Sequence, residues 1–192
     1  MRTRKIFGAS ILGVALADEY CQIRVNGDLA LFRALNRILI DRDAIDHEFI
    51  VEHCADFDSY VAQLEVDRAE TEFATGLSWQ QIERVADMVC ESNSVVVCWA
   101  MGLTQHKNSV PTIKEIVNFL LLRGNIGRPG AGACPVRGHS NVQGDRTMGI
   151  CERPDPAFLA RLGAEFGFQP PHRPGLDTVA AIQAMLDDPG RV

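Results

Sequence analysis

Residues 124–144, GNIGRPGAGACPVRGHSNVQG, combine the residue types that bind an oxygen-rich anion. Six glycines allow positive φ angles and a close approach of the backbone to a ligand. Arg137, Asn141 and Gln143 add guanidinium and amide groups that hydrogen-bond to oxygen atoms. A mobile surface loop is the alternative, but flexible linkers are rich in Ser and Gly rather than in Arg, Asn, Gln, Val and Cys. The segment therefore predicts an anion-binding loop.

The distribution of charge agrees with an anion site in this part of the chain. The 192 residues carry a net charge of −6, which argues against a general nucleic-acid binder. Residues 102–146 nevertheless carry a local charge of +4, so the rest of the chain sums to −10. A solvated basic surface without a partner is the other interpretation of this island.

The cysteine spacing excludes several metal and redox sites. The six cysteines are Cys21, Cys54, Cys90, Cys98, Cys134 and Cys151. No two are separated by only two residues, so the usual zinc-finger, thioredoxin and iron–sulfur spacings are missing from the sequence. Most lie in apolar contexts such as VVVCWA, where a free buried thiol is the default. We expect a reduced, cytoplasmic protein in which the chain ligates no metal.

Nucleotide and nucleophile motifs are not supported either. The run GNIGRPGAG is neither G-x-G-x-x-G nor a P-loop, and it follows an expected helix rather than a strand. Cys134 with His106 or His139 would make a Cys–His pair, but Pro135 follows Cys134 and no nucleophile elbow is recognisable. A packed cysteine is the better interpretation.

Residues 1–20 form a leading segment with two interpretations. Their basic start, apolar stretch and Ala15-Leu16-Ala17 are typical of a secretory signal, which would make the protein exported. Gly8 and Gly13 interrupt the apolar run, which favours the cytoplasmic alternative. The stretch is too short to span a membrane, so no membrane partner is expected.

The remaining pattern predicts an α/β fold, with residues 21–153 as one region and a Pro-rich connection with two helices over residues 154–192. We expect a short strand at 21–25, a helix capped by Asp28, a helix capped by Asp46, a single helix over 56–72, and a helix from the Ser78 capping box to about residue 90. The run 95–100 predicts a parallel strand buried on both faces. A loop over 101–110 and a helix from Pro111 to Gly124 follow.

Ligands of open α/β sheets bind at the carboxyl ends of the strands. Residues 101–106 leave the expected strand at that end. The Gly-rich loop over 125–144 is therefore expected to fold back over the same crevice.

Three motifs, in order, resemble the molybdopterin oxidoreductase family and, more narrowly, its formate-dehydrogenase-like catalytic subunits. They are CQIRVNGDLALFRAL, CWAMGLTQH, and GNIGRPGAG with PVRGHSNVQG. The resemblance covers roughly residues 15–185 and implies a partial Rossmann-like parallel sheet flanked by helices, with a Gly-rich cofactor-binding excursion. His139-Ser140 stand where many formate dehydrogenases have Gln-Asn, so formate specificity is not implied.

The resemblance also implies site residues. Arg137 would be catalytic, close to the molybdenum and holding a small oxyanionic substrate. The residues implied to bind the cofactor are Arg24, Asp28, Met101, Gly102, Gln105, Gly138, His139, Ser140, Asn141, Gln143 and Gly144. Two alternatives stay open: Asp28 as a simple helix N-cap, and Arg24 as a surface residue.

The implied cofactor is molybdenum bis-molybdopterin guanine dinucleotide. Members of this family are several times longer and bring an iron–sulfur module, which this chain does not ligate. An electron-transfer partner is implied but not identified. We therefore expect part of a molybdopterin-dependent oxidoreductase, with a truncated non-catalytic or partner-binding protein as the alternative.

Overall fold

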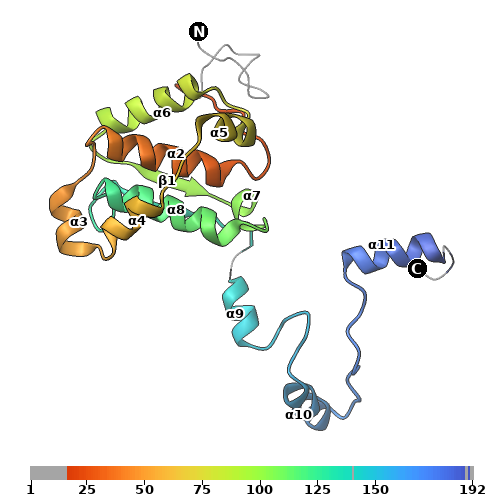
Figure 1. The fold of residues 1–192 in the computed structure, drawn as a ribbon. Coiled ribbons are helices and arrows are strands. Elements are labelled where there is room, and N and C mark those ends of the chain that lie inside the picture. Colours follow the sequence, from red (N-terminus) through yellow and green to blue (C-terminus); the bar gives the residue numbers. More distant parts are fainter. Residues whose placement is uncertain (1–16, 140, 189, 191–192) are drawn as a thin grey trace, which may run out of the picture. The chain divides into compact units, whose positions relative to one another are not determined.

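The computed structural model describes residues 17–139, 141–188 and 190, which fall into two compact units divided between Gly138 and His139. The first unit contains α2 (Asp28–Asp41), α3 (His47–His53), α4 (Phe57–Gln63), α5 (Arg68–Thr75), α6 (Trp79–Glu91), β1 (Val96–Trp99), α7 (Met101–Thr104), α8 (Ser109–Leu122) and β2 (Gly132–Pro135) (Figure 1). The second contains α9 (Val142–Thr147), α10 (Pro156–Phe166) and α11 (Thr178–Asp187). The α/β class is confirmed in its coarse form, and the boundary at 153–154 stays a prediction.

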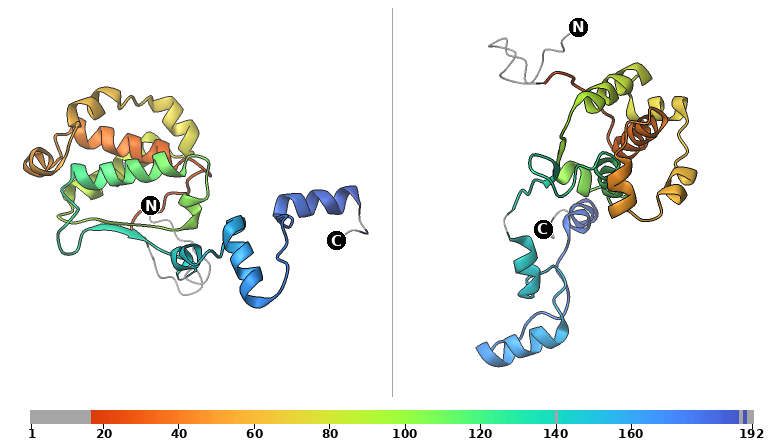
Figure 2. Two further views of the ribbon diagram at one scale, coloured as in Figure 1. Left: turned by 90° about the horizontal axis from the view of Figure 1, so that it is seen from below. Right: turned by 90° about the vertical axis from the view of Figure 1, so that its left-hand side faces the viewer.

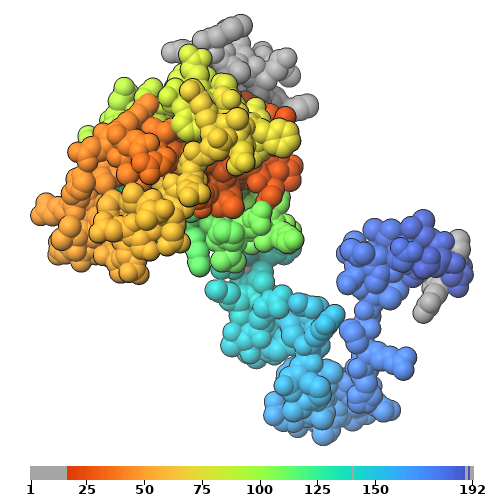
Figure 3. All heavy atoms as spheres, viewed as in Figure 1, coloured from red at the N-terminus to blue at the C-terminus, as the bar shows by residue number. Residues whose placement is uncertain are grey.

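The core of the first unit lies where α2 packs against α5, α6 and α8. Phe32 of α2 meets Phe119 of α8 edge to face, with ring centroids 5.6 Å apart. Figure 3 shows α3, α4 and α5, in orange to yellow, over the face of this unit that is turned to the viewer. The fully or almost fully buried apolar residues of this cluster include Ala34, Leu35, Leu39, Ile82, Ala86, Ile116, Phe119 and Leu120.

The sheet consists of β1 and β2, which pair in parallel from Val96 opposite Gly132 to Trp99 opposite Pro135. Figure 2 shows α2 and α8 on one face of this sheet. Val97 and Trp99 pack against the core, whereas Val96 and Cys98 are exposed. The predicted burial of this strand on both faces is therefore wrong, because the described residues cover only one face of the sheet.

The Gly-rich segment is more regular than a loop. Residues 132–135 form β2, and α9 begins at Val142. A strand here is possible because β2 has a single neighbour in the described sheet and needs backbone groups only on that side. The description of 124–144 as one continuous loop is thus corrected.

Several helix boundaries also differ from the prediction. The single helix over 56–72 is two helices, because Leu64 is buried between them and Asp67 starts α5 by accepting a hydrogen bond from the Glu70 amide. The strand expected at 21–25 is irregular backbone, with a turn at Val25-Asn26. Helix α8 begins at Ser109 rather than Pro111, and residues 101–104 form α7 rather than a loop.

Two N-caps are confirmed. The Ser78 Oγ accepts a hydrogen bond from the Gln81 amide at 3.3 Å, while the Gln81 side chain donates to Glu19 and to the Tyr20 carbonyl instead of closing the box. The Asp46 Oδ1 accepts from the Phe49 amide at 3.0 Å. Both side-chain oxygens accept hydrogen bonds from backbone amides of the first helical turn, which have no acceptor within the helix.

Replacing Asp46 by Ala is expected to lower the free energy of unfolding by about 1 kcal/mol, because the first turn of α3 loses its cap. Urea unfolding followed by circular dichroism measures this loss. Asp46→Asn keeps an acceptor and should restore most of it. The exposed Asp58→Ala in the first turn of α4 is the matched control. Equal losses for Asp46→Ala and Asp58→Ala would contradict a capping role.

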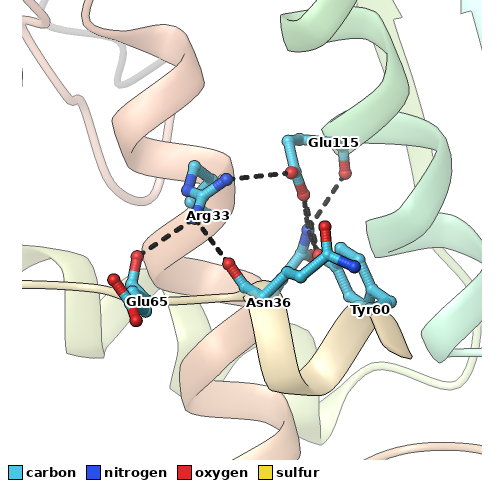
Figure 4. Close-up of polar contacts among 6 residues, drawn as sticks. Arg33, Asn36, Tyr60, Glu65 and Glu115 are labelled. Atoms are coloured by element: carbon cyan, nitrogen blue, oxygen red, sulfur yellow. Dashed lines mark hydrogen bonds and ion pairs between the residues drawn. The ribbon is translucent and has the colours of Figure 1, made fainter. Parts of the chain in front are cut away.

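A buried polar network joins α2, α4 and α8 (Figure 4). The carboxylate of Glu115, a residue that is 8% exposed, accepts hydrogen bonds from Tyr60 Oη at 2.7 Å and Asn36 Nδ2 at 3.0 Å. The Arg33 guanidinium lies 3.7 Å from the same carboxylate and donates to the Gln63 and Glu65 carbonyls. Buried polar groups of this kind are stable only while they keep their partners.

Arg123, the C-cap residue of α8, hydrogen-bonds to backbone carbonyls of the neighbouring segments. Its Nη1 donates to the Ala44 carbonyl at 2.9 Å, and its Nη2 donates to the Ser92 carbonyl at 2.9 Å and the Val89 carbonyl at 3.3 Å. The carbonyls at the end of α6 therefore gain a donor that the helix lacks. Gly124 follows with φ +56°, as predicted for a helix end.

Candidate functional site

The parallel pairing of β1 and β2 brings two predicted segments to one edge of the sheet. Met101–Thr104 follows β1 at its carboxyl end, and residues 136–138 follow β2 at its carboxyl end. The Val136 amide extends the ladder by donating to the Trp99 carbonyl at 2.7 Å. The expected meeting of these two segments at one edge is present in the first unit.

At this edge, the Met101 side chain contacts the Gln105 side chain and the Gly138 backbone. The Gln105 amide lies 3.6 Å from the Met101 sulfur, one helical turn away. A Cβ placed on Gly138 would lie 3.2 Å from the Met101 methyl carbon, so Met101 packs on the bare backbone of Gly138. Nothing lies within 4 Å of a Cβ placed on Gly102, so its backbone borders open space. The structure thus brings together Met101, Gln105 and Gly138.

Arg137 lies between β2 and Gly138, and its side chain is exposed. Within the described part of the chain, no hydrogen bond or ion pair engages its guanidinium. A guanidinium without such partners can donate its N–H groups to solvent or to an anion at the sheet edge.

Asn125 and Arg128 hold β1 and the Gly-rich segment in place, and neither was predicted from the sequence as a site residue. Asn125, 1% exposed, accepts hydrogen bonds through Oδ1 from the Val95 amide at 3.2 Å and from Arg128 Nη2 at 2.7 Å. Arg128 also donates to the Asn93 carbonyl. Their place inside GNIGRPG was the available signal, since an amide and a guanidinium between turn-forming glycines suit contacts to backbone carbonyls.

Arg24 and Asp28 lie at the start of α2. Arg24 is exposed, donates to the Phe73 carbonyl, and has its guanidinium 5.3 Å from the Phe73 ring centroid. Asp28 is the first residue of α2, whose N-cap is Gly27, and it makes no capping hydrogen bond. The N-cap interpretation of Asp28 is therefore wrong. In both Figure 1 and the left view of Figure 2, this end of α2 and α7 lie at the same end of the unit.

The remaining predicted residues belong to the second unit. Asn141 has φ +59° and precedes α9, and a Cβ on Gly144 would lie 2.3 Å from the Asn141 side-chain oxygen. Gly144 therefore makes room for the Asn141 amide. His139 and Gln143 are exposed, and Ser140 lies outside the described residues.

Other features of the described residues set limits on the site. No group of three or more His, Cys, Asp or Glu side chains in the part of the chain that the structure describes is arranged to hold a metal ion. Among the described helices, none has the length and apolar character needed to cross a membrane. Of the signal-like leading segment, residues 1–16 lie outside the described ranges.

Comparison with known proteins finds relatives that are longer than this chain. No protein-family profile matches the chain. An uncharacterized oxidoreductase of Mycobacterium tuberculosis is 52% identical over 98% of this chain, and the protein YdeP of Escherichia coli is 43% identical over 92%. A putative formate dehydrogenase of Staphylococcus aureus is 40% identical over 77% of the chain. The chain spans 25% of the length of the first two proteins and 16% of the third.

A solved structure shares the fold. Acetylene hydratase from Pelobacter acetylenicus superimposes on 60% of this chain and 16% of its own, with a TM-score of 0.57 and 22% identity. At that identity the likeness concerns the fold alone. The sequence relatives, by contrast, match most of this chain at 40% identity or more. The chain is thus related to proteins named as an oxidoreductase and as a putative formate dehydrogenase, and it corresponds to one part of their length.

Proposed function

We propose that this chain forms one wall of a molybdopterin guanine dinucleotide site in an oxidoreductase that oxidises or reduces a small substrate by two electrons. The observation that carries the proposal is the parallel β1–β2 pair, which brings the segments after CWA and CPV to one sheet edge. The relatives named as oxidoreductases support the redox class. The finer assignments, a partial Rossmann-like sheet and bis-molybdopterin guanine dinucleotide as the cofactor, rest on the motifs.

The residues at this edge fit such a cofactor in their chemistry. A dinucleotide with pyrophosphates and pterins needs close backbone approach, cations and amide groups. Gly102 offers open backbone, Gln105 an amide and Arg137 an exposed guanidinium. The local charge of +4 over residues 102–146 favours the phosphates.

The residues fall into three proposed roles. Arg137 holds an oxyanionic substrate with two parallel N–H donors and stabilises negative charge that develops on it. Met101, Gly102, Gln105 and Gly138 border the cofactor from the sheet edge, together with Arg24 and Asp28 from the start of α2. His139, Ser140, Asn141, Gln143 and Gly144 supply polar contacts to a pterin. When bound, the cofactor supplies the redox chemistry, and the protein supplies binding and orientation.

The test is the molybdenum and pterin content of the chain purified from a host that makes the cofactor. We expect both in the wild-type protein. Gly138→Val should lower both by about tenfold, which corresponds to roughly 1.4 kcal/mol of binding free energy, because the added side chain displaces Met101 from the edge.

Gly175→Val is the matched control, since nothing lies within 4 Å of a Cβ on Gly175 and no proposed contact involves it. It should retain the wild-type content. A folded wild-type chain with neither molybdenum nor pterin would refute cofactor binding by this chain and favour the non-catalytic, partner-binding alternative.

A further inference from the structure

Cys98 of β1 and Cys134 of β2 lie directly opposite each other in the parallel ladder. Backbone hydrogen bonds fix this register on both sides, from the Gly132 amide to the Val95 carbonyl at 3.0 Å and from Val136 to Trp99 at 2.7 Å. Neighbouring strands lie about 4.8 Å apart. Disulfides join residues whose Cα atoms are about 4.4–6.8 Å apart. The backbone thus already holds the two cysteines at a bridging separation.

Both thiols are also on the accessible face of the sheet. Side chains alternate along a strand, and Val97 and Trp99 occupy the face that packs on the core. Cys98 and Cys134 are exposed, whereas the other four cysteines are half-buried. This corrects the expectation of buried, packed thiols at these two positions. The neighbouring Cys134 thiol raises the pKa of Cys98.

We propose that Cys98 and Cys134 form an oxidisable thiol pair that closes a disulfide across β1 and β2 when it meets hydrogen peroxide. One thiol gives up its proton and its thiolate attacks the peroxide, the O–O bond breaks, and a sulfenic acid forms while the leaving hydroxide takes up that proton as water. The second thiol then attacks the sulfenic sulfur, the S–S bond forms, and a second water leaves. In total, two thiols lose two electrons and two protons, and one peroxide is reduced to two waters.

The position of this pair gives the bridge a mechanical effect. Met101 lies three residues after Cys98, and Arg137 lies three residues after Cys134. A covalent bond between the strands would hold the two segments of the sheet edge at a constant separation. This inference does not depend on the proposed cofactor, because it concerns the exposed face of the sheet rather than its carboxyl edge, and because it rests on its own chemistry.

The test treats the full chain at low micromolar concentration with hydrogen peroxide and alkylates the remaining thiols under denaturing conditions. We expect alkylatable thiols to fall from six to four in the monomer, with recovery of all six after phosphine reduction. Digestion after acidic residues separates Cys90 from Cys98 at Glu91, so mass spectrometry identifies the Cys98–Cys134 pair without ambiguity.

Cys98→Ser and Cys134→Ser should each abolish the monomeric bridge, whereas the control Cys151→Ser should retain it. Circular dichroism checks that the variants fold. The proposal is overturned if the wild type keeps six thiols, if a different pair is joined, or if the only disulfide links two chains.

Discussion

Replacing Tyr60 by Phe is expected to lower the free energy of unfolding by about 2 kcal/mol at neutral pH, because a buried carboxylate loses a hydrogen-bond donor. The hydroxyl of Tyr60 donates to Glu115 Oε2 at 2.7 Å and accepts from Asn36 Nδ2 at 2.9 Å. Phe fills the same volume, so little of the loss comes from packing. Urea unfolding at pH 7 measures the change.

Alkaline pH provides an independent readout of the same hydroxyl. Burial, followed by the hydrogen bond to Glu115, raises the pKa of Tyr60 well above its ordinary value of 10.0. Above pH 10.0 the unfolded chain loses this proton while the folded chain keeps it, so wild-type stability falls as pH rises. Each pH unit in this window costs at most about 1.4 kcal/mol, and less where solvent reaches this half-buried ring. Tyr60→Phe should lack this part of the alkaline decline.

The chain carries its own control, because Tyr20 is its only other tyrosine. The Tyr20 hydroxyl is exposed and donates to Gln22 two residues away. Tyr20→Phe should change stability by less than about 0.5 kcal/mol. If Tyr20→Phe and Tyr60→Phe were equally destabilising, the buried network would not carry the effect.

Replacing Gly27 by Ala is expected to cost about 2 kcal/mol, because one methyl group would be forced into packed backbone. A Cβ at this position would lie 2.8 Å from the Ala74 carbonyl oxygen and 3.0 Å from the Arg24 carbonyl oxygen. Gly27 has φ −82°, which any residue adopts, so the cost is steric rather than conformational. Thermal and urea unfolding should agree on its size.

Gly102→Ala is the matched control, since it adds the same methyl group where nothing lies within 4 Å. Because Gly102 lies in the short helix α7, Ala there should be neutral or slightly stabilising. A neutral Gly27→Ala would show that α2 and α5 can move apart at little cost, contrary to the packing described above.

The features that could be predicted from the sequence are those with local causes. Asp46 and Ser78 cap helices through side chains that act within one turn, and Gly124 ends α8 through its own φ angle. The starts of α10 and α11 have the same kind of local cause, because the carboxylates of Asp155 and Asp177 cap their first turns. Such contacts depend on a few neighbouring residues, so spacing alone reveals them.

The incorrect predictions concern features that depend on residues far apart in the sequence. Cys98 looks buried in VVVCWA, but its exposure depends on which elements cover each face of the sheet. The break between α4 and α5 depends on Leu64 entering the core, which no local pattern specifies. At the site, the rule for open α/β sheets predicted only that residues 125–144 return to the carboxyl end of the strand, whereas the contact of Met101 with Gly138 became visible in the structure. The roles of Arg137 and its neighbours stay predictions.

The contacts of Arg123 bear on how the first unit melts. One guanidinium ties the end of α8 to the carbonyls of Ala44, after α2, and of Val89 and Ser92, at the end of α6. None of these three helices can fray at this end without breaking bonds that belong to the others. Their amide protons should therefore exchange with solvent through one shared opening of the unit, rather than through separate local events.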